Sequence, residues 1–220
     1  RAGLVRVDEL EDLFAAAETL SWLKPLAGNE LLIVTNGGGA GVLAVDDLIQ
    51  SGGKLAPLRA DTAAQLDKIL PANWSRSNPV DIIGDAKPER YEAALDAILG
   101  NCDCDAILVM NCPTALASSS EAAQAVIDAV KRASGTKPVP PILTNWLGED
   151  AAHEGRRKFR EAHIPTYESP TDAIKGFFYL WHYTKAQEAL MRTPPRESEG
   201  TRIADEAARS IMRATAKAGD

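Results

Sequence analysis

Short apolar runs alternate with stretches of helical periodicity along most of the chain. Residues 31–35 (LLIVT) and 106–110 (AILVM) are consecutive apolar residues, the pattern of parallel strands buried on both faces. The intervening segments carry apolar residues three and four positions apart, as at Tyr91, Leu95 and Ile98, and therefore predict helices. Shorter strands are predicted at residues 54–58, 142–144 and 166–167, and residues 79–83 are predicted to be extended.

Side chains that accept hydrogen bonds from free backbone amides mark the starts of several helices. We expect Asp61, Ser118 and Ser169 to be N-caps, with Glu121 completing a capping box after Ser118 and Pro170 in the first turn after Ser169. The helix after residues 31–35 has its apolar positions at Val42, Leu43, Val45, Leu48 and Ile49.

Strands that alternate with helices predict an α/β fold, namely a doubly wound, flavodoxin-like, mostly parallel five-stranded sheet with helices on both faces. Residues 28–191 form this domain in our interpretation. Residues 1–27 are predicted to be a lead-in helix and linker, and residues 192–220 a linker followed by a helix. The aromatic residues between 177 and 183 are expected to dock the last helix of the domain on the sheet or on a neighbouring domain.

Composition narrows the function classes. The 220 residues carry a net charge of −7, which disfavours sequence-independent binding to nucleic acid or to an anionic membrane. No apolar run approaches the ~20 residues that a membrane-spanning helix needs. Three cysteines argue against a disulfide framework and indicate a reducing, cytoplasmic setting. Because the chain opens with Arg1, we expect it to be part of a longer protein.

Candidate chemistry lies in three loops that follow predicted strands, where parallel α/β sheets bind ligands. Residues 36–41 (NGGGAG) allow close backbone approach at a helix start, so they predict either an anion site or a tight strand-to-helix turn. They match neither a dinucleotide-binding fingerprint nor a Walker loop. Residues 83–86 are expected to open the next helix, with Asp85 opposing an anion unless it caps that helix. The small residues of 111–116 leave room for a small substrate.

The reactive residue types do not complete a catalytic site. Cys102 and Cys104 lack histidines at zinc-binding spacing, and no metal site is predicted. Cys112 follows a strand, where it is either a half-buried spectator or a nucleophile without a base. His153 lies three residues after Asp150 on one helix, which we interpret as a solvated face. The chain therefore carries half of an active site.

Three motifs occur in a specific order: TNGGGAGVLA, then NPVDIIGDA with PERY, then CPTA. In this order they resemble the ligase domain of the succinyl-CoA synthetase superfamily, and more closely the NDP-forming acyl-CoA synthetases, also called ADP-forming acetate–CoA ligases. The resemblance covers nearly the whole chain.

The resemblance implies an acid–thiol ligase that reversibly couples acyl-CoA, phosphate and ADP through an acyl phosphate and a phosphorylated histidine. It implies CoA and ATP or ADP with Mg²⁺ as cofactors, held mainly by partner domains: a CoA-binding domain, a phosphohistidine domain and an ATP-grasp unit. The substrate would be a small carboxylic acid or its acyl phosphate, and a homo-oligomer is compatible with it. The catalytic histidine is expected before Arg1, because His153, His163 and His182 do not match it. This chain alone is therefore expected to be inactive.

By position, the resemblance assigns three sets of binding residues. The first set matches a substrate-side loop, the second the start of a helix facing the phosphohistidine, and the third a loop lining the acyl-phosphate pocket. The first set is Asn36, Gly37, Gly38 and Gly39, the second is Gly84, Asp85 and Ala86, and the third is Thr114, Ala115 and Leu116. Two alternatives stay open. The same module occurs as a non-catalytic regulatory segment fused to an N-acetyltransferase, and a free-standing flavodoxin-like binding module is the weaker third interpretation.

Overall fold

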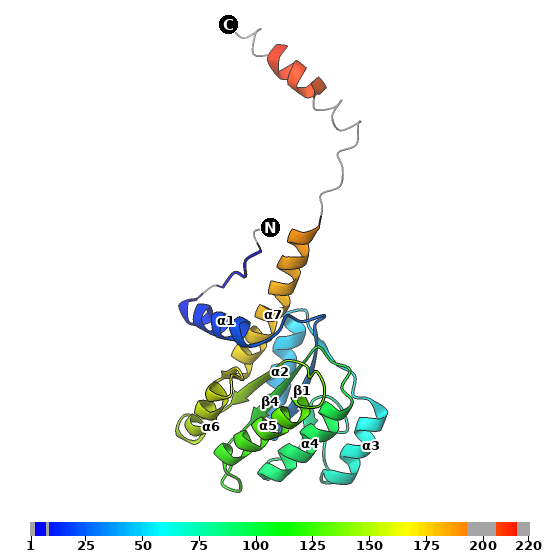
Figure 1. Cartoon of the computed structure of the whole chain (residues 1–220), viewed down its shortest axis with the longest axis vertical. Helices are drawn as coiled ribbons and strands as arrows, with labels where there is room; N and C mark the ends of the chain where they lie inside the picture. Colours follow the sequence, from blue (N-terminus) through cyan, green and yellow to red (C-terminus); the bar gives the residue numbers. More distant parts are fainter. Residues whose placement is uncertain (1–2, 8, 193–205, 215–220) are drawn as a thin grey trace.

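A mostly parallel sheet forms the centre of the computed structural model, which describes residues 3–7, 9–192 and 206–214 (Figure 1). The strand order is β2-β1-β4-β5-β6, and β3 pairs with β1 beyond the end of β2. The two longest apolar runs of the sequence form neighbouring strands in the middle of the sheet. The strands are β1 (Glu30–Thr35), β2 (Lys54–Leu55), β3 (Val80–Asp81), β4 (Ala106–Asn111), β5 (Ile142–Trp146) and β6 (Thr166–Tyr167).

Helices cover both faces of the sheet, which confirms the predicted doubly wound α/β fold. Helices α2 and α7 cover one face, α1 lies beside α7, and α3 to α6 cover the other face. The alternation is visible along β4, where Ile107 and Val109 join one core while Leu108 and Met110 join the other. The helices are α1 (Leu10–Trp22), α2 (Gly38–Gln50), α3 (Ala60–Ile69), α4 (Pro88–Gly100), α5 (Ser119–Ser134), α6 (Asp150–Glu161) and α7 (Pro170–Met191).

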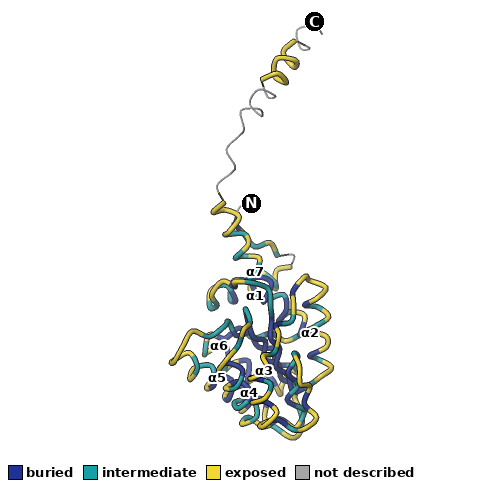
Figure 2. The backbone as a smooth tube through the Cα atoms, turned by 90° about the vertical axis from the view of Figure 1, so that its right-hand side faces the viewer, coloured by how far each residue is buried: buried dark blue, intermediate teal, exposed yellow. Residues whose placement is uncertain are grey.

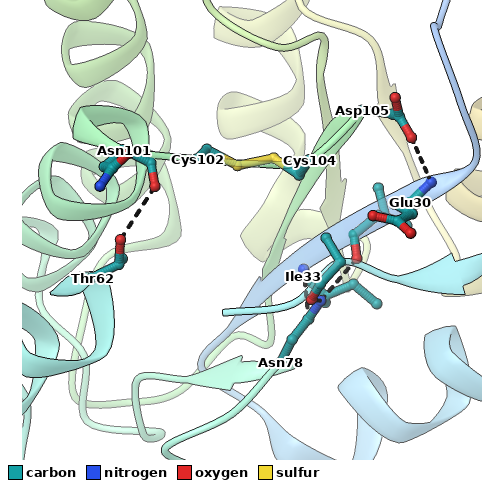
Figure 3. Close-up of a disulfide and its surroundings, with 10 residues drawn as sticks. Glu30, Ile33, Thr62, Asn78, Asn101, Cys102, Cys104 and Asp105 are labelled. Atoms are coloured by element: carbon teal, nitrogen blue, oxygen red, sulfur yellow. Dashed lines mark hydrogen bonds between the residues drawn. A yellow bond between two sulfur atoms is a disulfide. The ribbon is translucent and has the colours of Figure 1, made fainter. Parts of the chain in front are cut away.

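The sheet has six strands rather than five because the extended segment at 79–83 also pairs with β1, with Val80 opposite Val34. Asn78 fills the gap between β2 and β3 along the same edge of β1. Its side chain accepts a bond from the Ile33 amide at 3.0 Å and donates to the carbonyls of Leu31 and Ala56 (Figure 3). One asparagine side chain thus replaces the missing stretch of strand.

Two of the three expected caps are confirmed. The hydroxyl of Ser118 accepts from the Glu121 amide, and that of Ser169 accepts from the Asp172 amide. The expectation for Asp61 is wrong, since α3 begins at Ala60 and Asp61 lies inside its first turn. Its carboxylate instead binds its neighbours, including the Arg59 guanidinium.

The apolar positions of α2 divide between core and solvent. Leu48 is fully buried, whereas Val42, Leu43 and Ile49 are each more than half exposed. The trace of α2 accordingly carries both buried and exposed colours (Figure 2). Ala44 and Leu48 belong to the core that α2 shares with α7, and the bulkier side chains of Val42, Leu43 and Ile49 face outward.

Polar as well as apolar contacts attach helix α1 to β6 and α7. Thr19 shares a hydrogen bond of 2.5 Å with the buried Tyr167 hydroxyl, and Lys175 on α7 pairs with Asp12 at 3.1 Å. The buried aromatic side chains of α7, Phe177 and Phe178, dock it on the sheet as expected.

The division into residues 1–27, 28–191 and 192–220 stays a prediction. The sequence also predicts Asp8 and Glu11 as a capping pair for the first helix, but Asp8 lies outside the described residues, as does most of the expected linker. Residues 206–214 are helical and exposed. Within the part of the chain that the structure describes, no helix is long and apolar enough to cross a bilayer.

Cys102 and Cys104 form a disulfide in the turn between α4 and β4, with 5.6 Å between their α-carbons (Figure 3). The cysteine count argued against a disulfide framework, and this single local pair is not foreseen by that argument. An odd cysteine count argues against a framework of long-range staples, but it does not exclude a local pair separated by one residue. The third cysteine, Cys112, is free.

Candidate functional site

The loops after β1 and β4 are held together at the carboxyl edge of the sheet by the side chain of Asn36. Its Nδ2 donates to the Cys112 carbonyl at 2.9 Å, and its Oδ1 accepts from the Cys112 amide at 2.7 Å. Asn36 is only 4% exposed. Both polar atoms are thus engaged with backbone, so Asn36 positions the two loops relative to each other.

Helix α2 begins in this cluster with an uncapped N-terminus. Gly37 occupies the N-cap position, and no side chain of the described residues caps the helix. Gly37 itself is fixed by the Thr35 hydroxyl, which accepts from its amide at 3.0 Å. The first amides of an α-helix have no partner within the helix, so those of Gly38 and Gly39 are available to a ligand.

The glycines allow three surfaces to come close together. A Cβ on Gly37 would lie 2.4 Å from the Cys112 sulfur, and a Cβ on Gly38 would lie 2.8 Å from Oδ2 of Asp81. Nothing lies within 4 Å of a Cβ built on Gly39. The first two glycines are required by packing, whereas the third leaves bare space beside the helix start.

Asp81 is a residue that our sequence reasoning missed. Its Oδ1 accepts from the Ile83 amide at 2.9 Å, and its other oxygen faces Gly38 at the start of α2. A carboxylate there is stabilised by the positive end of the helix dipole. Its place as the one charged residue in the middle of the extended PVDII segment, in the second of the three motifs, was the available signal.

The second loop does not open a helix, contrary to expectation. Residues 84–86 form a turn, closed by the Ala86 amide on the Ile83 carbonyl at 3.0 Å, and α4 starts only at Pro88. Gly84 lies against the backbone of Asn36.

Asp85 does not cap α4. It pairs with Arg90, whose guanidinium lowers the pKa of the Asp85 carboxyl. The Asp85 carboxylate therefore faces α4 and not the start of α2.

The third loop is an exposed turn. Thr114 and Ala117 form an isolated bridge, and Leu116 is 69% exposed. Ala115, between them, is exposed too. In this chain the three residues assigned to the acyl-phosphate pocket form an outer wall of the cluster, open to solvent on one side.

A buried polar chain supports the end of β4. The Ser119 hydroxyl donates to Asn111 Oδ1 at 2.8 Å, Asn111 Nδ2 donates to the Tyr91 hydroxyl at 2.9 Å, and Tyr91 donates to the Met110 carbonyl. Burial raises the pKa of Tyr91 strongly, so the phenol stays protonated. This chain fixes α4 and α5 to β4 and was not foreseen from the sequence.

Cys112 fits the spectator interpretation better than the nucleophile. Burial raises the pKa of its thiol, and the nearby negative charge of Asp81 raises it further, so the reactive thiolate is disfavoured. The histidines lie elsewhere: His163 contacts Trp22, and His182 packs against Phe178. Among the described residues, no group of three or more His, Cys, Asp or Glu side chains could hold a metal ion.

The model of the family described as the Ligase-CoA domain matches residues 31–188, which include all three loops. The chain belongs to this family. The Ligase-CoA domain here is 32% identical over 185 residues to an acetate–CoA ligase [ADP-forming] I of Archaeoglobus fulgidus, covering 84% of this chain and 25% of that protein. It is 31% identical to the acetate–CoA ligase [ADP-forming] II subunit alpha of Pyrococcus furiosus, covering 84% of this chain and 40% of that subunit.

Solved structures agree with the sequence relatives of this Ligase-CoA domain. The apo form of a dinucleotide forming acetyl-coenzyme A synthetase 1 of Candidatus Korarchaeum cryptofilum superposes with a TM-score of 0.80 and 30% identity, covering 86% of this chain and 41% of that one. The chain thus spans well under half of the relatives and structures it matches.

Proposed function

We propose that this chain is the ligase domain of an ADP-forming acyl-CoA synthetase and that the start of α2 receives a phosphoryl group during the reaction. The proposal is supported by the uncapped, glycine-lined helix start, because it lies within the segment that matches the Ligase-CoA family. Related proteins are ADP-forming acetate–CoA ligases, and the Korarchaeum synthetase has also been solved with phosphate and ADP.

A helix N-terminus offers about half a positive charge and free N–H donors. Such donors stabilise a transferring phosphoryl group without rearranging during the reaction. Gly39 supports this role, since it is exposed and nothing lies within 4 Å of a Cβ built on it, whereas the Asp81 carboxylate lies beside the preceding Gly38. Asn36 and Cys112 contribute by holding the neighbouring loop in register.

In this proposal, other domains or subunits of the enzyme supply the remaining groups that the reaction needs. As the resemblance to the NDP-forming acyl-CoA synthetases implies, we assign Mg²⁺ and the phosphohistidine to partner domains or subunits. The relative labelled subunit alpha supports such a division of the enzyme. The acid–thiol ligase activity then belongs to the assembly, and this chain supplies one wall of its site.

The test is Gly39→Ala in the assembled synthetase, assayed for acyl-CoA formation from acid, CoA and ATP. The added methyl group meets no protein atom, and alanine favours the helix, so the fold should be kept. We expect a loss of about tenfold or more in kcat, since the methyl group keeps the phosphoryl group from the amides.

The matched control is Gly100→Ala at the end of α4, where a Cβ also meets nothing within 4 Å. This variant should keep its activity within about twofold. Equal activities of the two variants would overturn the role of α2. An assembled protein that forms no acyl-CoA in its unsubstituted form would overturn the synthetase assignment itself.

A further inference from the structure

A hollow of about 950 Å³ lies at the amino edge of the sheet, away from the glycine loop. Three segments line it: the end of α1 with residues 22–24, the end of α5 and its following loop with residues 130–131 and 134–142, and residues 162–164 after α6. Its size is within the range of pockets that hold a nucleotide-sized ligand.

The hollow has an apolar lining with two flat rings. Val139, Ile142 and Ile164 contribute aliphatic surface. The rings of Trp22 and His163 meet edge to face, with centroids 5.2 Å apart and planes at 74°. Such rings offer stacking and edge contacts to a flat aromatic ligand.

Cations are gathered around this lining although the chain as a whole is acidic. Lys24, Lys131 and Lys137 line the hollow, whose lining residues include no aspartate or glutamate. Lys137 donates to the Gly100 carbonyl, whereas the ammonium groups of Lys24 and Lys131 have no partner among the described residues. Two lysines from separate elements can therefore meet a multiply charged anion.

His163 adds an independent observation, because its backbone adopts a conformation that favours glycine. Its φ is +54°, and the Ile164 amide bonds to the Phe159 carbonyl at 2.9 Å. This is a Schellman ending of α6 with histidine where glycine is usual, at a cost of about 1 kcal/mol. A strained side chain retained at the lining of a hollow is a pointer to a ligand.

We propose that this hollow binds a nucleoside polyphosphate, with the base against Trp22 and His163 and the phosphates between Lys24 and Lys131. The apolar lining suits the base and the unpaired ammonium groups suit the phosphates. A free nucleotide and the adenosine phosphate part of CoA share this chemistry. The site is separate from the start of α2, and it does not depend on the proposed synthetase activity.

The experiment titrates the 220-residue chain with ADP, ATP, CoA, adenosine and inorganic phosphate, using calorimetry and amide chemical-shift mapping. We expect saturable binding of ADP, ATP or CoA, with shift changes at residues 130–142 and 162–164. Adenosine and phosphate should each bind at least tenfold more weakly. A preference between ADP and CoA then distinguishes the two sources of the ligand.

Three variants locate the site. Lys131→Glu should weaken ADP binding tenfold or more, whereas Lys54→Glu, the same exposed charge change on β2, should have little effect. His163→Gly should also weaken binding while keeping or raising the thermal midpoint, since glycine suits the φ of this position. This combination separates loss of a ligand contact from loss of the fold.

Several results would overturn the proposal. The first is that no nucleotide binds saturably at millimolar concentration. The second is that Lys131→Glu leaves the affinity for ADP unchanged. The third is that amide chemical shifts change only at residues 37–41. Binding of a glutamate-rich peptide through Lys131 without ADP binding would also overturn it, in favour of a protein-docking surface. Gly39→Ala leaves this hollow intact, so the failure of one proposal is distinguishable from that of the other.

Discussion

Helices α2 and α5 both begin at the carboxyl edge of the sheet, yet their first turns are built in opposite ways. The start of α5 is closed: Ser118 caps it, and Ser119 is tied to Asn111 in a buried polar chain. The start of α2 has no side-chain cap and is lined by glycines. A free helix start forgoes the stabilisation of about 1 kcal/mol that a cap gives. This edge of the sheet therefore combines a rigid support at α5 with an open, ligand-accessible helix start at α2.

The strongest test of the support is Asn111→Ala. This change removes the acceptor of Ser119 and the donor to Tyr91, leaving both hydroxyls buried with fewer partners. We expect the free energy of unfolding to fall by about 3 kcal/mol, measured by urea denaturation. Gln124→Ala on the exposed face of α5 is the control and should change it by less than about 0.5 kcal/mol. Similar losses for both variants would show that the buried chain contributes nothing.

The second prediction is that substitutions at the two helix starts change the free energy of unfolding in opposite directions. Ser118→Ala should destabilise the chain by about 1 kcal/mol, because the Glu121 amide loses its acceptor. Gly39→Ala should stabilise it by about 0.5 kcal/mol, because alanine loses less backbone entropy and finds open space. Thermal and urea unfolding measure both. Destabilisation by Gly39→Ala would mean that the start of α2 is as closed as that of α5.

How much of this difference between α2 and α5 the sequence predicts depends on how far apart in the sequence the interacting residues are. The two long strands and the Ser118 and Ser169 caps follow from local patterns, which is why they were correctly predicted. The pairing of Asn36 with Cys112 joins residues 76 positions apart, and the position of Asp81 beside Gly38 depends on β3 joining β1. Such contacts require the strand order, which local periodicity does not contain.

The Cys112 thiol reports on the electrostatics between the two helix starts. Its pKa is raised by burial and by Asp81, so the folded state holds the proton more tightly than the unfolded chain does. This contribution to stability is fully present below the usual thiol pKa of about 8.5 and falls as the pH rises above it. Asp81→Asn should lower the pKa of Cys112 and speed its alkylation by iodoacetamide at pH 8.5 about twofold. An unchanged rate would mean that the Asp81 charge does not reach the sulfur.

The smallest effect is expected at Asp85, the carboxylate that sequence reasoning placed at a helix start. It is exposed and paired with Arg90, which lowers its pKa, so any stability it gives is present at neutral pH and is lost as the pH falls through the folded pKa. Because an exposed ion pair contributes little, Asp85→Asn should leave the thermal midpoint at pH 7 unchanged within error. The assembled enzyme carrying this change should also keep its kcat, since Asp85 faces α4 and not the start of α2. A loss of kcat without a loss of stability would contradict the assignment of the phosphoryl site to the glycines of α2 and would favour the turn at residues 84–86.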